Sequence, residues 1–173
     1  MPHLPPQDLM SVFQQNPSRY LPLTKVIQNI MRGESSFTPG ERELIAAYVS
    51  SLNACDFCYG SHRAIAINLK IDPDLLEAIT KDIATAPIEE RWRSVFALVE
   101  KLTKTPSNVT QADIDLVLEA GWDAPAVEDI IAVCALFNFM NRLVDGFGLE
   151  LPPQEQLAGM ATMINSNGYD AII

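Results

Sequence analysis

Apolar residues recur every three or four positions along most of the chain, which is the spacing of one face of an α-helix. No run of alternating apolar and polar residues is long enough to predict a strand. The pattern therefore predicts an all-α fold. We expect helices at 6–15, 20–32, 39–52, 55–69, 73–81, 87–104, 111–120, 125–145 and 154–165, followed by a polar turn and an apolar tail.

Capping residues and prolines mark where several of these helices begin. The clearest start is formed by Thr38, Pro39 and Glu41, which supply a threonine cap, a first-turn proline and an acid three residues after the cap. The sequence TQAD at 110–113 repeats the same capping pattern, and Gly121 is a stop signal. These signals support the helix limits given above.

The helix expected at 125–145 is apolar around much of its surface. The residues responsible are Ile130, Ile131, Val133, Leu136, Phe137, Phe139, Met140 and Leu143. So broad an apolar surface indicates a helix that is central in the core or buried in a subunit interface. One face also carries polar residues, namely Asn138, Asn141, Arg142 and Asp145. This set is expected either to line a pocket or an interface, or to form an internal hydrogen-bond network with an Arg142–Asp145 pair.

Length, composition and charge narrow the class of protein. The chain has 173 residues, of which 48% are hydrophobic and 20% charged, as expected for one globular domain. We expect a single domain over 1–173, with its core at about 20–152, an arm at 1–19 and a terminal helix and tail at 153–173. The net charge of −10 disfavours nucleic acid and anionic membrane surfaces as partners.

No targeting or membrane-spanning signal is evident. The first ten residues, MPHLPPQDLM, lack the basic and apolar regions of a signal peptide. No apolar run approaches the roughly 18–20 residues that are needed to span a bilayer. The expected location is therefore the cytoplasm, where a close pair of cysteines is more often catalytic or metal-binding than a structural disulfide.

The stretch NACDFCYGSH at 53–62 holds two of the three cysteines and one of the two histidines. In a helix, Cys55, Cys58 and His62 would share one face near the N-terminus, where unpaired N–H groups favour a thiolate. An imidazole one turn from Cys58 can accept its proton or stabilise its thiolate. Cys58 is therefore expected to attack, and Cys55 to resolve the oxidised sulfur as a disulfide.

A histidine that acts as a base is most effective when a third group orients it. Glu41 and Glu43 on the preceding helix are the candidates. The two helices should pack antiparallel as a hairpin, so that Glu43 meets His62 directly or through one water.

Two other interpretations of the cysteine pair stay open. A zinc site needs four ligands, and beyond Cys55, Cys58 and His62 the chain offers only the distant Cys134 and His3. The two cysteines could also be buried, inert thiols. Cys134 lies within IIAVCALF and is expected to be a small core residue.

The stretch ERELIAAYVSSLNACDFCYGSH at 41–62 resembles the alkylhydroperoxidase D-like members of the carboxymuconolactone decarboxylase superfamily. Their signature is a glutamate, eleven residues, and then Cys-x-x-Cys-x-x-x-His, which Glu43, Cys55, Cys58 and His62 match. The sequence FNFMNRLVDGFG at 137–148 resembles the peroxidase-related enzyme subgroup. The resemblance extends from about residue 20 to residue 152.

This resemblance implies an all-helical bundle with a Cys-x-x-Cys hairpin, assembled as a homodimer, trimer or hexamer. It implies peroxide reduction, with Cys58 as the peroxidatic thiol, Cys55 as the resolving thiol, and Glu43 and His62 as a proton relay. It implies no metal, haem or flavin. The sequence departs from some members at Phe57, where they carry a histidine.

The main hypothesis is a thiol-dependent peroxidase that reduces hydrogen peroxide or alkyl hydroperoxides through a Cys55–Cys58 disulfide cycle. A dithiol, either a protein or a small thiol, would reduce the disulfide. The alternatives are a disulfide oxidoreductase or redox partner with little peroxidase activity, and a non-enzymatic helical protein with a structural metal site. Asn138, Asn141 and Asp145 are candidates for residues around the catalytic group.

Overall fold

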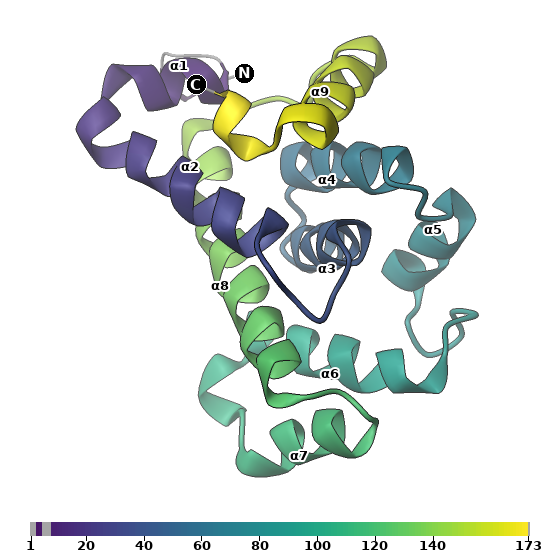
Figure 1. The fold of residues 1–173 in the computed structure, drawn as a ribbon. Coiled ribbons are helices and arrows are strands. Elements are labelled where there is room, and N and C mark those ends of the chain that lie inside the picture. Colours follow the sequence, from purple (N-terminus) through teal and green to yellow (C-terminus); the bar gives the residue numbers. More distant parts are fainter. Residues whose placement is uncertain (1–2, 5–7, 173) are drawn as a thin grey trace.

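The computed structural model describes residues 3–4 and 8–172, and every regular element in these two ranges is helical (Figure 1). In chain order the elements are α1 (Leu9–Gln15), α2 (Pro17–Arg32), α3 (Pro39–Leu52), α4 (Asp56–Asn68), α5 (Pro73–Lys81), α6 (Glu90–Lys104), the 3₁₀ turn η1 (Pro106–Asn108), α7 (Gln111–Glu119), α8 (Ala124–Phe147), α9 (Gln154–Asn167) and the 3₁₀ turn η2 (Tyr169–Ile172). The predicted all-α fold is confirmed.

The helix limits differ from the predicted ones by no more than three residues where both can be compared. Residues 6–7 of the first expected helix lie outside the described ranges. The tail differs in kind, because the expected apolar end of the chain forms the 3₁₀ turn η2.

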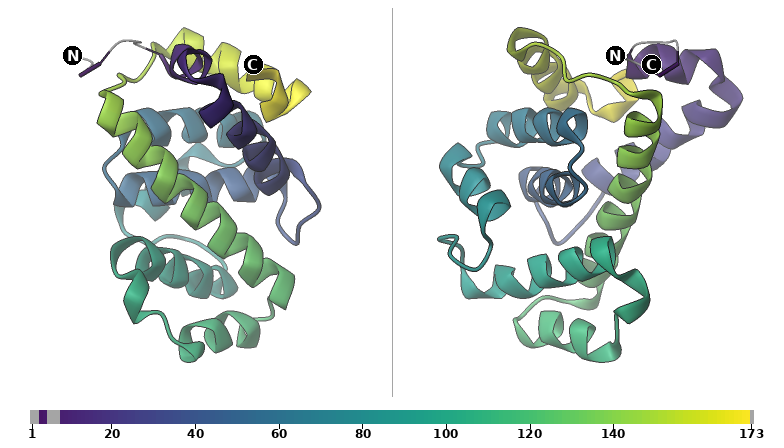
Figure 2. Two further views of the ribbon diagram at one scale, coloured as in Figure 1. Left: turned by 90° about the vertical axis from the view of Figure 1, so that its left-hand side faces the viewer. Right: turned by 180° about the vertical axis from the view of Figure 1, so that it is seen from behind.

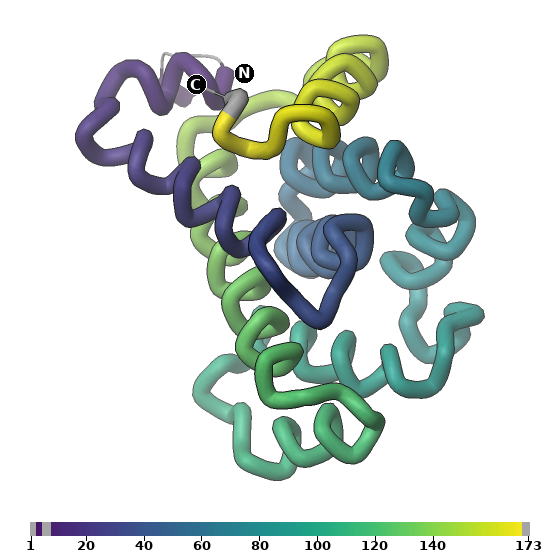
Figure 3. The backbone as a smooth tube through the Cα atoms, in the orientation of Figure 1, coloured from purple at the N-terminus to yellow at the C-terminus, as the bar shows by residue number. Residues whose placement is uncertain are grey.

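Five helices lie one above another, in the order α9, α4, α3, α6 and α7 (Figure 1). Each of these helices contacts the next, and α3 and α4 make the most extensive contact as the predicted hairpin. Helix α8 crosses the stack along one side and contacts α3, α6, α4 and α7 (Figure 2). The path of the backbone in Figure 3 shows α2 and the C-terminal turn meeting beside α9. This arrangement brings the two ends of the described chain to the side of the α3–α4 hairpin.

A single hydrophobic core runs through the described part of the chain. It includes Val12 and Phe13 of α1 and Ile164 and Tyr169 near the C-terminus, so buried residues extend beyond the expected core limits of 20–152. The domain limits as a whole stay a prediction.

Helix α8 has the central position that its apolar surface predicts. Ile130, Val133 and Val144 are completely buried, whereas Ile131 and Phe139 are 41% and 47% exposed on the outer side. An exposed pair of this kind is compatible with the expected homo-oligomer, which stays a prediction.

The expectation that no segment approaches a membrane span needs correction for α8. This helix is 24 residues long and contains an 18-residue window with a mean hydropathy of 1.4, so by length and composition it could cross a membrane. The core helix of a soluble protein passes the same test. The contacts of α8 with five other helices account for its apolar character.

The turn between α3 and α4 closes with a left-handed residue that is not glycine. Ala54 has φ 53°, its N–H donates to the Ser51 carbonyl at 3.1 Å, and the Cys55 N–H donates to the Ser50 carbonyl at 3.0 Å. These are the two hydrogen bonds of a Schellman motif. An alanine there costs about 1 kcal/mol or more relative to an ordinary helical conformation. The motif fixes the direction in which the chain enters α4.

The capping box at the start of α3 forms as predicted. The Thr38 hydroxyl accepts from the Glu41 N–H at 3.3 Å, and the Glu41 carboxylate accepts from the Thr38 N–H at 2.7 Å. We expect Thr38→Ala to lower the free energy of unfolding by about 1 kcal/mol, because it removes the partner of an otherwise unpaired N–H group. Urea unfolding followed by circular dichroism measures the change.

The matched control is Thr162→Ala, which removes an exposed threonine within α9 whose hydroxyl donates to the Ala158 carbonyl. Alanine is the better helix former at such a position, so this variant should lose no stability. Equal unfolding midpoints for the two variants would show that the capping box contributes nothing.

Candidate active site

The centre of the site is a direct contact between the two helices of the hairpin. Glu43 lies in the second turn of α3, and its carboxylate is 2.6 Å from His62 Nδ1 on α4. Because a carboxylate can only accept a hydrogen bond, Nδ1 carries the proton and the other ring nitrogen of a neutral His62 is left to act as a base. The sequence-based expectation that these two side chains meet is therefore met without an intervening water.

A residue of α8 also contacts the His62 imidazole and limits its movement. The Phe137 ring stands edge-on to it, with the ring centroids 4.2 Å apart. His62 is 8% exposed, so its ring has little freedom to rotate away from the carboxylate. The ring is fixed from two sides by groups on different helices.

The Glu43 carboxylate is completely buried and has two further partners. Its Oε1 accepts from the Tyr169 hydroxyl at 2.7 Å and lies 2.8 Å from an Arg32 guanidinium nitrogen. Arg32 also lies over the Tyr169 ring, 4.9 Å from its centroid. Three hydrogen-bond donors from α2, α4 and η2 thus surround one carboxylate.

These partners decide the protonation state of Glu43. Burial alone would raise its pKa, but the attraction and hydrogen bond of His62, the charge of Arg32 and the hydroxyl of Tyr169 outweigh burial and lower the pKa. Burial also raises the pKa of Tyr169, and the adjacent Glu43 charge raises it further, so the phenol stays protonated and donates. Glu43 is therefore an ionised carboxylate inside the protein.

Neither Arg32 nor Tyr169 could be recognised as a site residue from the sequence. Arg32 is the last residue of α2, and Tyr169 lies in the C-terminal tail, 126 positions from Glu43. The sequence indicated them only indirectly. A glutamate such as Glu43, on an otherwise apolar helix face, needs hydrogen-bonding partners if it is buried, but the sequence does not say which residues these are.

The two cysteines of the pair are free thiols with different surroundings. Cys58 lies in the first turn of α4, and Cys55 is the residue that caps this helix. A hydrogen bond to Cys58 is the largest cause of a raised pKa at Cys55, followed by burial, and the Asp145 carboxylate raises it further. The raised pKa means that the Cys55 thiol keeps its proton at neutral pH.

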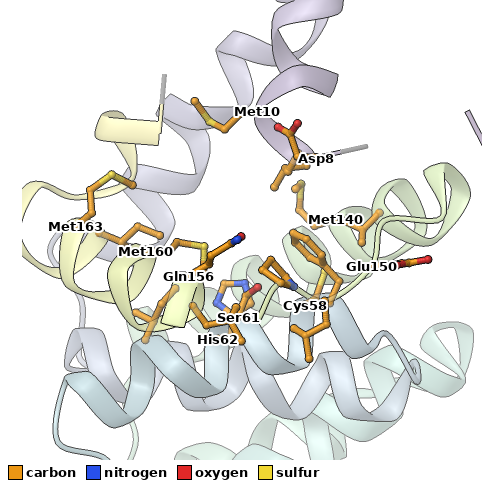
Figure 4. A pocket seen from close by; sticks show the side chains of 18 of the residues that line it. Asp8, Met10, Cys58, Ser61, His62, Met140, Glu150, Gln156, Met160 and Met163 are labelled. Atoms are coloured by element: carbon orange, nitrogen blue, oxygen red, sulfur yellow. The ribbon is translucent and has the colours of Figure 1, made fainter. Parts of the chain in front are cut away.

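Cys58 and His62 line a cavity of about 650 Å³ (Figure 4). Most of its lining is apolar and comes from α1, α4, α8 and α9. Cys55 lines a different cavity, of about 450 Å³, whose residues come from α3, α4, α5 and the turns beside them. The two cavities have no lining residue in common.

The polar set predicted on α8 forms an internal network with the hairpin turn. The Asn53 side chain donates to Asn138 at 3.1 Å and to Asn141 at 2.8 Å, and Asn141 donates to Ser50 at 3.1 Å. Arg142 donates to the Asn138 carbonyl and side chain rather than pairing with Asp145. These contacts fasten the end of α3 to α8, just before Cys55.

The third cysteine has the core position predicted for it. Cys134 is 1% exposed, with Thr103 Oγ1 at 3.4 Å from its sulfur. Within the described ranges, no group of three or more His, Cys, Asp or Glu side chains is placed to hold a metal ion. The alternative of a structural metal site therefore gains no support from these residues.

Comparison with known proteins supports the resemblance seen in the sequence. Residues 22–101 match the model of the carboxymuconolactone decarboxylase family, and this segment includes Glu43, Cys55, Cys58 and His62. This segment is therefore similar to members of the carboxymuconolactone decarboxylase family. No curated protein sequence matches the chain at a significant level.

Solved structures with the same fold extend the similarity beyond the carboxymuconolactone decarboxylase segment. An uncharacterized peroxidase-related protein from Silicibacter sp. TM1040 is 27% identical, with a TM-score of 0.79, 88% of this chain covered and 79% of that one. An uncharacterized peroxidase-related protein from Ralstonia eutropha JMP134, described as an alkylhydroperoxidase AhpD core, is 24% identical, with a TM-score of 0.79. The match covers 87% of this chain and 78% of that one. The predicted AhpD-like bundle is thus confirmed.

A third structure with this fold has a different described activity. It is a cysteine-to-alanine variant of the debrominase Bmp8 in complex with 2,3,4-tribromopyrrole. It is 17% identical to this chain, with a TM-score of 0.72, and the match covers 87% of this chain and 81% of that one. At this identity the likeness shows the fold alone. The fold by itself therefore does not identify the chemistry.

The donors around Glu43 predict a specific pH dependence of stability. Because the folded pKa of Glu43 is lowered, its ionisation stabilises the protein above the unfolded pKa of about 4.3, and this contribution is lost as the pH falls through the folded pKa. Tyr169→Phe removes one donor to the charge. We expect the free energy of unfolding to fall by about 1.5–3 kcal/mol at pH 7. The loss should shrink as the pH falls and Glu43 takes up a proton.

Urea unfolding between pH 3 and pH 7 measures this dependence. The matched control is Tyr48→Phe, which alters the other buried tyrosine, one that makes no hydrogen bond to Glu43. Its effect on stability should not change with pH over this range, because burial raises the pKa of Tyr48 to about 12. A Tyr169→Phe loss that is equally independent of pH would contradict the proposed charge stabilisation.

Proposed function

We propose that this protein is a thiol-dependent peroxidase that reduces hydroperoxides through a Cys55–Cys58 disulfide. The observation that carries the proposal is the joint exposure of Cys58 and His62 to one cavity, with His62 oriented by a buried, ionised Glu43. A nucleophile, a base and a group that orients the base are the parts that activated thiol chemistry requires.

The first step is attack of the Cys58 thiolate on the outer oxygen of the hydroperoxide. The O–O bond breaks, Cys58 is oxidised to a sulfenic acid, and the departing oxygen takes a proton and leaves as an alcohol, or as water when the substrate is hydrogen peroxide. His62 takes the thiol proton and returns it to the departing oxygen. Glu43 stabilises the imidazolium that exists between these two transfers.

The second step joins the two cysteines. The Cys55 sulfur attacks the Cys58 sulfur, and the sulfenic oxygen leaves as water while the disulfide forms. Cys55 and Cys58 lie near each other at the start of α4, as this step requires. Asp145, the carboxylate beside Cys55, is positioned to accept the proton that Cys55 must lose.

A dithiol returns the enzyme to its reduced state by thiol–disulfide exchange. We propose that it attacks Cys55 from the cavity of about 450 Å³, which is separate from the cavity that Cys58 lines. Substrate and reductant would then approach the pair by different routes. We further propose a homo-oligomer in the cytoplasm as the working form.

A disulfide oxidoreductase is the second candidate function. It is favoured by the Cys-x-x-Cys pair at a helix start, which is an arrangement that redox proteins use. The burial of both sulfurs disfavours it, because Cys55 and Cys58 are 1% and 4% exposed and a folded protein disulfide could not reach either of them directly. A peroxide can enter the cavity that a protein cannot.

Substitution of each cysteine tests the cycle. Cys58→Ser is expected to abolish peroxide reduction, because a hydroxyl is not ionised at neutral pH. Cys55→Ser should permit one oxidation and stop at a sulfenic acid on Cys58, since no resolving thiol remains. Stopped-flow fluorescence measures the oxidation, and mass spectrometry after dimedone labelling locates the sulfenic acid.

Cys134→Ser is the control for these variants, because it replaces a buried cysteine that lines neither cavity. It should turn over like the unaltered protein. Dimedone on Cys55 in the Cys58→Ser variant would reverse the two assigned roles. Exchange with dithiols without any peroxide reduction by the unaltered protein would favour the disulfide oxidoreductase.

The relay is tested by Glu43→Gln, which keeps the shape of the side chain and removes its charge. We expect kcat/KM for hydrogen peroxide to fall about 10²-fold, because the His62 imidazolium loses its counter-charge. Glu41→Gln is the matched control on the same helix, since Glu41 lies outside the site in the capping box. An unchanged kcat/KM in folded Glu43→Gln protein would exclude the relay.

A further inference from the structure

The Ser61 hydroxyl has no hydrogen-bond partner although it is buried. Ser61 is 5% exposed, and among the residues that the structure describes its Oγ and the Arg42 Nε are the buried side-chain polar atoms without a partner. A buried hydroxyl that makes no hydrogen bond costs free energy, so such a group needs an explanation.

Several other helical hydroxyl groups in this protein find a partner within their own helix. Ser50 donates to the Ala46 carbonyl at 2.8 Å, and Ser94 donates to the Arg91 carbonyl at 2.9 Å. A serine within a helix commonly bonds in this way to a carbonyl three or four residues earlier. Ser61 lies within α4 but makes no such bond, so its hydroxyl is left available to another acceptor or donor.

Ser61 also lies where a substrate would react. Ser61 is three residues and His62 is four residues after Cys58, so each of them is a neighbour of Cys58 on the surface of α4. All three line the cavity of about 650 Å³, and Figure 4 shows them together on its floor. The unpartnered hydroxyl is therefore beside the proposed nucleophile and base.

The rest of the cavity indicates the kind of molecule that fits. Its walls are largely apolar, and four methionines contribute, namely Met10, Met140, Met160 and Met163. Its charged lining residues are Asp8 and Glu150, and in the described ranges no lysine or arginine lines it. A cavity of this volume and lining suits an apolar molecule of drug-like size, and an anion that entered it would lose its hydration without gaining a lysine or arginine partner among the described lining residues.

We propose that Ser61 is a substrate-positioning residue in a site for uncharged, bulky organic hydroperoxides, an inference that rests on the proposed peroxidase function. The apolar group of the hydroperoxide occupies the methionine-lined space, and the Ser61 hydroxyl donates to the inner peroxide oxygen. When Cys58 takes the outer oxygen and becomes a sulfenic acid, the O–O bond breaks. The inner oxygen, still hydrogen-bonded to Ser61, receives the proton that His62 took from Cys58 and leaves as the alcohol.

The test compares Ser61→Ala with the unaltered protein. For cumene hydroperoxide, we expect the second-order rate constant of Cys58 oxidation to fall about tenfold, which is the value of one hydrogen bond. The melting temperature should not fall, because no hydrogen bond within the protein is lost. Ser50→Ala, the matched control, should lower the melting temperature, because Ser50 bonds to Ala46 and Asn141.

Two substrate pairs test the proposed selectivity in the unaltered protein. Cumene hydroperoxide should react faster than hydrogen peroxide, because only the former fills the apolar space. The methyl ester of linoleic acid hydroperoxide should react faster than the free acid, because the carboxylate of the acid would be desolvated in the largely apolar cavity. Equal rates within both pairs would overturn the assigned substrate class. An unchanged rate constant in Ser61→Ala would overturn the role of Ser61.

Binding of an unreactive alcohol separates this inference from the proposed function. Calorimetry with 2-phenyl-2-propanol, the alcohol formed from cumene hydroperoxide, should show tighter binding to the unaltered protein than to Ser61→Ala. If the unaltered protein reduces no hydroperoxide yet binds the alcohol through Ser61, the peroxidase function fails and the assignment of the cavity stands. Equal binding to both proteins, or none, would overturn the assignment.

Discussion

The structure around the active site depends on one buried carboxylate. Glu43 is ionised and completely buried, a state that is costly unless the charge is paired and hydrogen-bonded. Its three partners, Arg32, His62 and Tyr169, belong to α2, α4 and the C-terminal turn. Each of these segments must therefore be in place before the charge is stabilised. The orientation of the His62 ring, which Glu43 holds, therefore depends on the folding of the chain from α2 to the C-terminal turn.

The turn between α3 and α4 gives the two neighbouring cysteines different surroundings. Ala54, in its left-handed conformation, ends one helix, and Cys55 caps the next. Asn53 fastens this turn to α8 through two side-chain hydrogen bonds. As a result, Cys58 faces the large apolar cavity while Cys55 lines the smaller one. Each sulfur thus borders a cavity of its own, as the proposed separate routes for substrate and reductant require.

The proposed reactive groups and much of the wall of the 650 Å³ cavity come from different parts of the chain. The segment that matches the family, residues 22–101, contains the glutamate, both cysteines and the histidine. Much of the cavity wall comes from outside this segment, from α1, α8 and α9, including all four lining methionines. The proposed reactive groups thus lie within the matched segment, while helices outside it contribute much of the wall around them.

The local sequence determined the helices and the reactive face, because both depend on residues three or four positions apart. Capping residues located the helix starts, and the spacing of Glu43, Cys55, Cys58 and His62 indicated the thiol chemistry. Only the tertiary structure could supply Arg32 and Tyr169, since helical spacing relates residues three or four positions apart and these two lie 11 and 126 positions from Glu43. The same holds for the cavity, whose walls come from helices distant in the chain, and for Ser61. An unpartnered hydroxyl is recognised only when every neighbour is known.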